Sequence, residues 1–286
     1  MKNKEKERLD ILLVKRGFYN SREKAKRAIM AGEVLIDHKK SLKVGQILNS
    51  DCSISLLKKK SEFVSRGGDK LNKAILEFTI SVEEKKVIDV GASTGGFTDC
   101  LLRYGAKEVY CIDVGYGQLA WKLQKDSRVV VMDRTNIRYL KPEAFNLLFD
   151  LATIDVSFIS LEKVIPVVNQ LLTPEGEIIA LIKPQFEAGK EYIQKGGIVK
   201  KPEVHQMVIE KISNLALSIN FGVYGIIYSP LKGINSNIEY LIYLKKDLCA
   251  CVNNTMVFQE IKKVVQEAHT ALSLKKNKTI KFIHNK

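Results

Sequence analysis

The stretch VIDVGASTGGFTD, residues 87–99, decides the fold expected for this 286-residue chain. Its apolar, β-branched start predicts a buried strand, and the glycines that follow predict a tight turn into a helix. Such a turn lets the backbone approach a ligand closely, and the start of the helix offers unpaired amide groups. A dinucleotide fingerprint would need glycine where this chain has Ser93, so a pyrophosphate ligand is disfavoured. A tight turn that binds no ligand remains the alternative.

Apolar runs and helical stretches alternate from residue 85 onward. This alternation predicts an α/β fold with a Rossmann-like, largely parallel sheet that is covered on both faces. The expected strands are 87–92, 109–114, 129–134, 151–158, 177–186, 222–231 and 238–244, and the expected helices are 202–219 and 256–272.

Carboxylates accompany the first strands of the expected sheet. Asp89 precedes the glycine turn, and Asp113 and Asp133 end the next two strands. Because parallel strands end at one edge, these acids would share a crevice, with Asp113 suited to ribose hydroxyls and Asp133 to an adenine amino group. Either acid alone is more often a polar strand end. The combination resembles the cofactor loop of S-adenosylmethionine-dependent methyltransferases, and the predicted cofactor-binding residues are Asp89, Gly91, Ser93, Gly95, Gly96, Phe97, Thr98, Asp113, Asp133 and Asp155.

Two further charged residues follow the fourth and fifth strands. Asp155 begins the segment DVSF, and Lys183 ends an otherwise apolar strand. An ammonium group is costly there unless it is paired or used, and desolvation favours the neutral amine, which can act as a base. Extension of the lysine into solvent is the alternative.

Residues 7–57 predict a small α+β unit with helices near 9–17 and 21–32 and strands at 33–37 and 52–57. The net charge is +9 over residues 1–70, +1 over 71–246 and +4 over 247–286. Positive charge concentrated in this way favours a polyanionic partner, nucleic acid ahead of membrane. A lysine-rich solubilising surface is the alternative reading.

The first unit has a recognisable pattern, R-L-D-x-L-L-V-x-R-G from Arg8, then S-R-x-x-A-x-x-x-I-x-x-G-x-V from Ser21. This pattern resembles the alpha-L RNA-binding module named after ribosomal small-subunit protein four. The resemblance implies contacts with the RNA backbone. The predicted RNA-binding residues are Arg16, Arg22, Lys26 and Arg27, together with Arg66 in the segment that leads to the second domain.

Four motifs in the second domain occur in a characteristic order: SRGGDKL with Lys70, DVSF with Asp155, KPQFE with Lys183, and NSNIEY with Glu239. Their order resembles the ribose 2′-O-methyltransferases of the FtsJ-like superfamily, and residues 6–246 resemble the TlyA family of ribosomal-RNA methyltransferases, also called haemolysins. The resemblance implies Lys70, Asp155, Lys183 and Glu239 as catalytic residues, S-adenosylmethionine as cofactor and no metal. It implies a cytidine of ribosomal RNA, free or within a ribosomal subunit, as substrate. Phe63 stands where some relatives have tryptophan, which leaves the role of the linker open.

The expected domains are an RNA-binding domain at 1–60, a linker at 61–70 made flexible by Gly67 and Gly68, a methyltransferase domain at 71–248, and a C-terminal helix with a basic tail at 249–286. The start of the chain lacks the apolar stretch of a signal peptide, no run is long enough to span a membrane, and the five cysteines show no paired spacing. A cytoplasmic protein is therefore expected.

Two other classes of function compete with the enzyme. One is a non-catalytic ribosome-binding factor that keeps the cofactor pocket, although retention of all four catalytic positions weighs against it. The other is a membrane-lysing protein, which the absence of an apolar span disfavours. The sequence leaves open the modified nucleotide and the oligomeric state.

Overall fold

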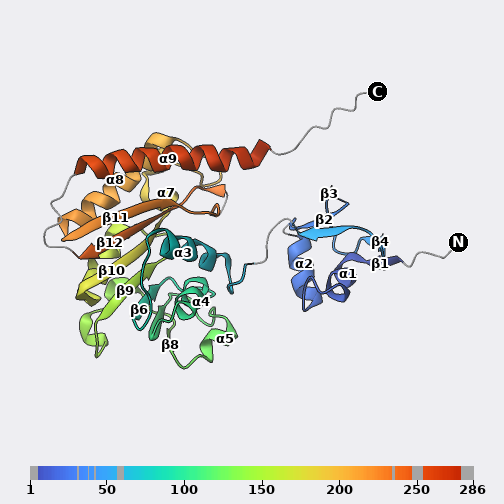
Figure 1. Cartoon of the computed structure of the whole chain (residues 1–286), viewed down its shortest axis with the longest axis horizontal. Coiled ribbons are helices and arrows are strands. Elements are labelled where there is room, and N and C mark those ends of the chain that lie inside the picture. The colour runs from blue at the N-terminus through green and yellow to red at the C-terminus, as the bar shows by residue number, and fades with distance from the viewer. Residues whose placement is uncertain are drawn as a thin grey trace. The chain divides into compact units, whose positions relative to one another are not determined.

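The computed structural model describes residues 6–30, 32–37, 39–41, 43–56, 61–233, 236–246 and 254–277. The chain divides into two compact units, Met1–Lys60 and Ser61–Lys286. Figure 1 labels their helices and strands. The predicted boundary near 248–249 and the basic end at 278–286 lie outside the described residues.

The N-terminal unit combines two helices with short strands. Apolar side chains at helical spacing, including Leu9, Leu13 and Ile29, are buried together with Val34 in its core. The strands pair antiparallel in two groups, β1 with β4, and β2 with both β3 and β5. The elements are β1 (Lys6–Arg8), α1 (Leu9–Lys15), α2 (Arg22–Met30), β2 (Val34–Ile36), β3 (Lys39–Lys40), β4 (Ile47–Asn49) and β5 (Ile54–Leu56).

The second unit is built on a seven-stranded sheet in the order β11-β12-β10-β9-β6-β7-β8. The five strands from β10 to β8 are parallel, and β12 runs antiparallel to both β10 and β11. The Rossmann-like α/β prediction is therefore confirmed. The strands are β6 (Lys86–Val90), β7 (Glu108–Ile112), β8 (Val129–Met132), β9 (Phe149–Ile154), β10 (Leu172–Ile182), β11 (Phe221–Tyr228) and β12 (Tyr240–Lys246).

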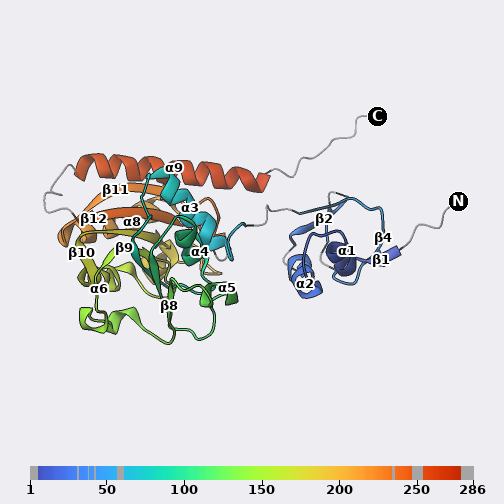
Figure 2. The ribbon, with the colours of Figure 1, turned by 60° about the horizontal axis from the view of Figure 1, so that its bottom comes forward.

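Helices cover both faces of this sheet (Figures 1 and 2). Successive residues of β10 alternate between two cores: Ile178 and Ala180 pack with α6, α8 and α9, whereas Ile179 packs with α3, α4 and α5. This alternation buries β10 on both faces, as the continuous apolar run predicts. The α-helices are α3 (Arg66–Glu77), α4 (Gly96–Arg103), α5 (Trp121–Gln124), α6 (Ile165–Leu171), α7 (Pro184–Glu187), α8 (Pro202–Ser218) and α9 (Asn254–Asn277), and the 3₁₀ helices are η1 (Ile137–Tyr139), η2 (Pro142–Ala144), η3 (Leu161–Lys163) and η4 (Lys190–Tyr192).

The segment 61–70 differs from the flexible linker that its glycines predict. Ser65 caps α3 by accepting a hydrogen bond from the Gly67 amide, so Gly67 and Gly68 belong to the first turn of a helix. A Cβ atom at Gly68 would lie 2.2 Å from Cγ of Phe63. The glycine therefore permits close packing of the chain rather than flexibility, a distinction that depends on a tertiary neighbour.

Six of the seven strands of this sheet end earlier than their expected ranges, and two of these ends bear on the charged residues. β9 ends at Ile154 and β10 at Ile182, so Asp155 and Lys183 begin loops at the same edge of the sheet. Pro184 has no amide hydrogen to continue the ladder and instead opens α7. In both cases the strand ends immediately before the charged residue, Asp155 or Lys183.

Candidate active site

The glycine turn between β6 and α4 lies at the point where the strand order reverses, because β6 pairs with β7 on one side and β9 on the other. Gly91 has a φ of +85°, and a Cβ there would lie 2.7 Å from the backbone oxygen of Asp155. Gly95 has a φ of +88°, and a Cβ there would lie 2.3 Å from Leu123 Cδ1. Open α/β sheets bind ligands at such a reversal, and here only glycine fits the turn.

Asp113 and Asp133 follow β7 and β8, and both carboxylates fix the loops beside the turn. Asp113 accepts hydrogen bonds from the amides of Ser93, at 2.8 Å, and Gly115, at 2.7 Å. Asp133 accepts a hydrogen bond of 2.8 Å from the Gly117 amide. Backbone amides thus already bond to both oxygens of Asp113 and to one oxygen of Asp133.

Asp89 and Thr98, both predicted to bind the cofactor, lie in the interior and line neither of the two cavities at this edge. Thr98 and Thr153 donate hydrogen bonds of 2.6 and 2.8 Å to the Asp89 carboxylate. Burial raises the pKa of Asp89 to about 6, and the two hydroxyl donors oppose that rise. The network ties β6, α4 and β9 together beneath the turn, so these residues support the glycine turn from the interior.

The four residues predicted to be catalytic form two ion pairs at the same edge. Lys183 Nζ lies 2.7 Å from Asp155 Oδ1 and donates a hydrogen bond of 2.9 Å to Ser157 Oγ. Lys70 Nζ donates a hydrogen bond of 2.7 Å to Glu239 Oε2, across 169 residues of sequence. The side chains of the two lysines are only 10% and 11% exposed, so both charges are largely desolvated and compensated by a carboxylate.

Two adjoining cavities open at this edge and share Gly91, Ser93, Asp155 and Ser157. The first, about 570 Å³, is also lined by Lys70 and Lys183, and the second, about 760 Å³, by Asp113. Of the predicted cofactor residues, Gly91, Ser93, Gly96, Phe97, Asp113 and Asp155 line a cavity, whereas Asp89, Gly95, Thr98 and Asp133 do not. One edge of the sheet therefore presents the predicted catalytic groups and a ligand-sized space together.

Several residues of the site were not predicted from the sequence. Ser157 holds Lys183, and Gln118 and Asn136 line the second cavity. At Gly233, a Cβ would lie 1.8 Å from Glu239 Oε1, so glycine is needed for the carboxylate to reach Lys70. Ser157 lies inside the quoted DVSF motif and could have been found there, but nothing local marks Gly233.

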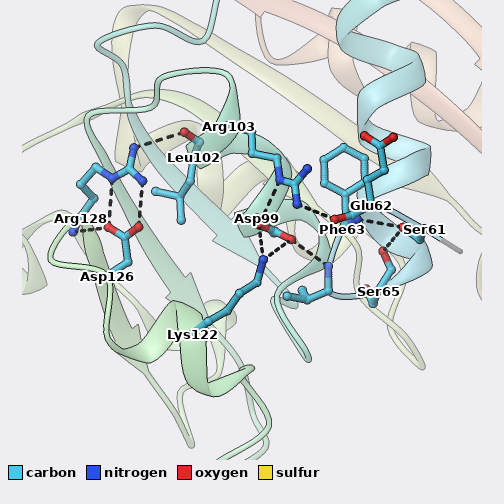
Figure 3. Close-up of polar contacts among 11 residues, drawn as sticks. Ser61, Glu62, Phe63, Ser65, Asp99, Leu102, Arg103, Lys122, Asp126 and Arg128 are labelled. Carbon is cyan, nitrogen blue, oxygen red and sulfur yellow. Dashed lines mark hydrogen bonds and ion pairs between the residues drawn. The ribbon is translucent and has the colours of Figure 1, made fainter. Parts of the chain in front are cut away.

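A polar cluster around Asp99 holds the start of α4 from the outside (Figure 3). Its carboxylate accepts hydrogen bonds of 2.8 Å from the Val64 amide and 2.9 Å from Lys122 Nζ. Arg103 bonds to the same carboxylate and to the Glu62 backbone oxygen, and its guanidinium lies over the ring of Phe63. The segment that precedes α3 is therefore fastened to α4, whose first residues line the first cavity.

The cations predicted to bind RNA differ in their availability. Arg16 donates to the backbone oxygens of Ser50 and Cys52, and Arg22 pairs with the buried Asp10 at 2.7 Å. Lys26 pairs with Glu23 at 2.7 Å. Arg27 is exposed and makes no hydrogen bond or ion pair with the described residues, and Arg66, in the other unit, donates to the Lys232 backbone oxygen. Arg16 and Arg22 therefore have a structural task besides any contact with RNA.

The buried Asp10 should make the N-terminal unit sensitive to acid. Burial raises the pKa of this carboxyl, but Arg8 and Arg22 outweigh burial and bring it to about 2. Because the folded pKa is depressed, the stabilisation is complete above the ordinary value near 4 and is lost as pH falls towards 2.

Asp10→Asn is therefore expected to accelerate hydrogen exchange in α1 and α2 at pH 7 and to flatten the dependence of that exchange protection on pH between 4 and 2. Exchange in α4, in the other unit, serves as the internal control. Unchanged protection of α1 in the variant would contradict the role of Asp10.

The fold and site define a methyltransferase with a Rossmann-like sheet. Residues 63–246 match the FtsJ-like methyltransferases and residues 7–51 match the S4 domain. The chain therefore belongs to the FtsJ-like methyltransferase family, in the group of S4-containing proteins that includes TlyA.

Named relatives extend over most of the chain. The 16S/23S rRNA (cytidine-2′-O)-methyltransferase TlyA of Mycobacterium tuberculosis is 40% identical over 83% of this chain and 89% of its own. Hemolysin A of Brachyspira hyodysenteriae is 39% identical over 82% of this chain and 98% of its own. A solved structure from Streptococcus thermophilus, described as a haemolysin, has a TM-score of 0.76 and 42% identity, covering 96% of this chain and all of that one.

Proposed function

We propose that this protein methylates the 2′-hydroxyl of a cytidine ribose in ribosomal RNA, using S-adenosylmethionine. The observation that carries the proposal is the juxtaposition of two lysine–carboxylate pairs, Lys183–Asp155 and Lys70–Glu239, with the cavities beside the glycine turn. The choice of cytidine and of ribosomal RNA rests on the activities named for the TlyA relatives.

The cavities fit the cofactor in size and polarity. The chain approaches closely at Gly91, where a Cβ would collide with backbone, and this space suits a ligand held against main-chain atoms. Asp113 would accept the ribose hydroxyls, with Gly91, Ser93 and Gly96 against the methionine portion, and Asp133 would act through the loop that it orders. When bound, the cofactor supplies an electrophilic methyl group.

The chain's own residues then orient the attacking oxygen and handle its proton. A ribose hydroxyl is a weak nucleophile, so alignment and proton removal are the tasks left to the protein. Lys183 holds the 2′-oxygen, and Asp155 and Ser157 fix the position of the Lys183 nitrogen. For Lys183 to act as the base, its ammonium group first passes a proton to the Asp155 carboxylate or to water, and the neutral amine then takes up the proton of the 2′-hydroxyl. Glu239 holds Lys70, which also lines the first cavity. The positive charge of Lys70 then compensates the negative charge that develops on the 2′-oxygen.

Binding of ribosomal RNA or a ribosomal subunit is assigned to both units. The S4 domain supplies contacts with the RNA backbone, and Arg66, which lines the first cavity in the other unit, adds a positive charge beside the reaction site. A ribosomal substrate places the enzyme in the cytoplasm.

The haemolysin names of some relatives raise membrane lysis as a second candidate. Among the described residues, no helix is both long and apolar enough to cross a membrane. The retained ion pairs favour the methyltransferase over lysis and over a non-catalytic ribosome-binding factor.

Isothermal calorimetry combined with ribose-methylation mapping tests the proposal. The protein should bind S-adenosylmethionine more tightly than NAD. Ribosomal RNA treated with the protein should gain a 2′-O-methylated cytidine, and the bond that follows this nucleotide should then resist alkaline cleavage. Tighter binding of NAD would overturn the cofactor assignment, and identical methylation maps with and without the protein would overturn the activity.

Neutralising the exposed Arg27 should weaken RNA binding and flatten its dependence on salt. Each lost phosphate contact is expected to reduce the slope of log affinity against log salt by about 1, equally for unrelated RNA sequences. Binding of ribosomal RNA by Arg27→Gln would be measured by fluorescence anisotropy between 50 and 200 mM salt.

Arg128→Gln is the control, because Arg128 lies in the other unit and pairs with Asp126 at 2.8 Å. A slope for Arg27→Gln equal to that of the wild type, with Arg128→Gln also unchanged, would remove Arg27 from the RNA interface.

A further inference from the structure

Glu187 is a buried carboxylate that the proposed reaction does not use. It ends α7, four residues after Lys183, and is only 7% exposed. Burial raises the pKa of its carboxyl, and the hydrogen bonds that it accepts oppose the rise. It lines neither cavity, so it does not touch bound ligands. Burying a carboxylate costs free energy unless its oxygens are hydrogen-bonded, so a buried carboxylate next to the site is expected to have a specific role.

Both oxygens of Glu187 bind the segment that follows β9. Oε2 accepts a hydrogen bond of 2.6 Å from Ser160 Oγ, and Oε1 accepts one of 2.8 Å from the Leu161 amide. Ser160 and Leu161 lie where the loop from Asp155 enters η3. Glu187 therefore joins the loop after β10 to the loop after β9, its neighbour in the sheet.

These two loops carry the partners of one ion pair. The β9 loop holds Asp155 and Ser157, and both contact Lys183 at the start of the β10 loop. Between them and Ser160 lies Phe158, whose φ of +62° is unfavourable for a side chain of this size and whose side chain is 88% exposed. Such a loop needs an anchor in the interior to keep one conformation.

Among the described ties between the two loops, those made by Glu187 come from a buried carboxylate that borders neither cavity. The Lys183–Asp155 pair borders the cavities, and the rings of Phe158 and Phe186, 5.0 Å apart, lie against solvent on the Phe158 side. We propose that Glu187 is a positioning residue, which sets the distance of Asp155 and Ser157 from Lys183 by fixing the far end of their loop. This inference rests on the proposed methyl transfer, because Lys183 is the group being positioned.

The alternative is that Glu187 serves only to stabilise η3. The two readings differ in their effect on turnover by folded protein. If Glu187 positions the site, Glu187→Ala should lower kcat by about 10- to 100-fold, because displacements near 1 Å cost about that much. S-adenosylmethionine affinity should fall by a smaller factor than kcat: Ser160 lines the second cavity, but the glycine turn and Asp113 keep their contacts.

Glu187→Gln should rescue most of the lost turnover. Its amide oxygen can accept the Leu161 hydrogen bond while its amide nitrogen donates to Ser160 Oγ. Ser160→Ala combined with Glu187→Ala should cost no more than Glu187→Ala alone, since both changes release the same contact.

Glu177→Ala is the matched control. Glu177 lies in the middle of β10, away from the Lys183 end, is 8% exposed and is bonded to Lys85, Lys245 and Tyr243. It should lower the melting temperature while leaving kcat per folded enzyme unchanged.

Methyl transfer to ribosomal RNA, cofactor affinity and thermal unfolding are to be measured on each full-length variant. The inference fails if folded Glu187→Ala turns over like the wild type, if Glu177→Ala loses as much turnover, or if lost cofactor affinity accounts for the change. A wild-type protein inactive on ribosomal RNA would count against the proposed function itself.

Discussion

Lys183→Ala is expected to slow methyl transfer by about 10²–10⁴-fold, the usual cost of losing a general base. The Lys183 nitrogen contacts both Asp155 and Ser157 just after β10 ends. Lost positioning of the 2′-oxygen would add to the cost. The affinity for S-adenosylmethionine should barely change, because Asp113 and the glycine turn are untouched.

Single-turnover methyl transfer and calorimetric cofactor binding, on the same folded preparation, measure the two quantities separately. Lys85→Ala is the control, because Lys85 also pairs with a buried carboxylate, Glu177, but one in the middle of β10, away from the site. Near-normal transfer by Lys183→Ala, or a loss explained by weaker cofactor binding, would exclude Lys183 from the chemical step.

Gly91→Ala is expected to weaken cofactor binding by about 10- to 100-fold, which corresponds to the usual cost of forcing a side chain into a disfavoured backbone region. The residue has a φ of +85°, and its new Cβ would lie 2.7 Å from the Asp155 backbone oxygen. Relief of this contact must move either the turn or the start of the loop that carries Asp155. Catalysis should therefore fall together with cofactor affinity.

Gly105→Ala separates the two causes. Gly105 has nearly the same φ, +83°, but a Cβ there would meet Glu83 only at 3.4 Å or more, an ordinary contact. This control should lose stability without losing affinity for S-adenosylmethionine. Equal cofactor affinities of the two variants would show that close approach at Gly91 does not shape the cofactor site.

The sequence by itself determined the α/β class, the glycine turn and the positions of the charged strand ends. Apolar runs of strand length indicate buried strands. A glycine-rich turn between a strand and a helix is likewise a local feature that can be read from the sequence. Asp113, Asp155 and Lys183 could be placed at one edge because parallel strands end together. The resemblance added Lys70 and Glu239, which no spacing rule would have connected.

The tertiary structure alone decided which polar groups face the cavities and which are used within the fold. Asp89 and Thr98 are buried beneath the turn because each finds a partner there, and Arg22 is bound to Asp10. Gly68 packs against Phe63 instead of loosening a linker. Residues that bond or pack together in this way lie apart in the chain. A local pattern can therefore indicate that a residue is polar or small, but not which residue it contacts. Long-range packing supplies that neighbour, as the 169-residue separation of Lys70 and Glu239 illustrates.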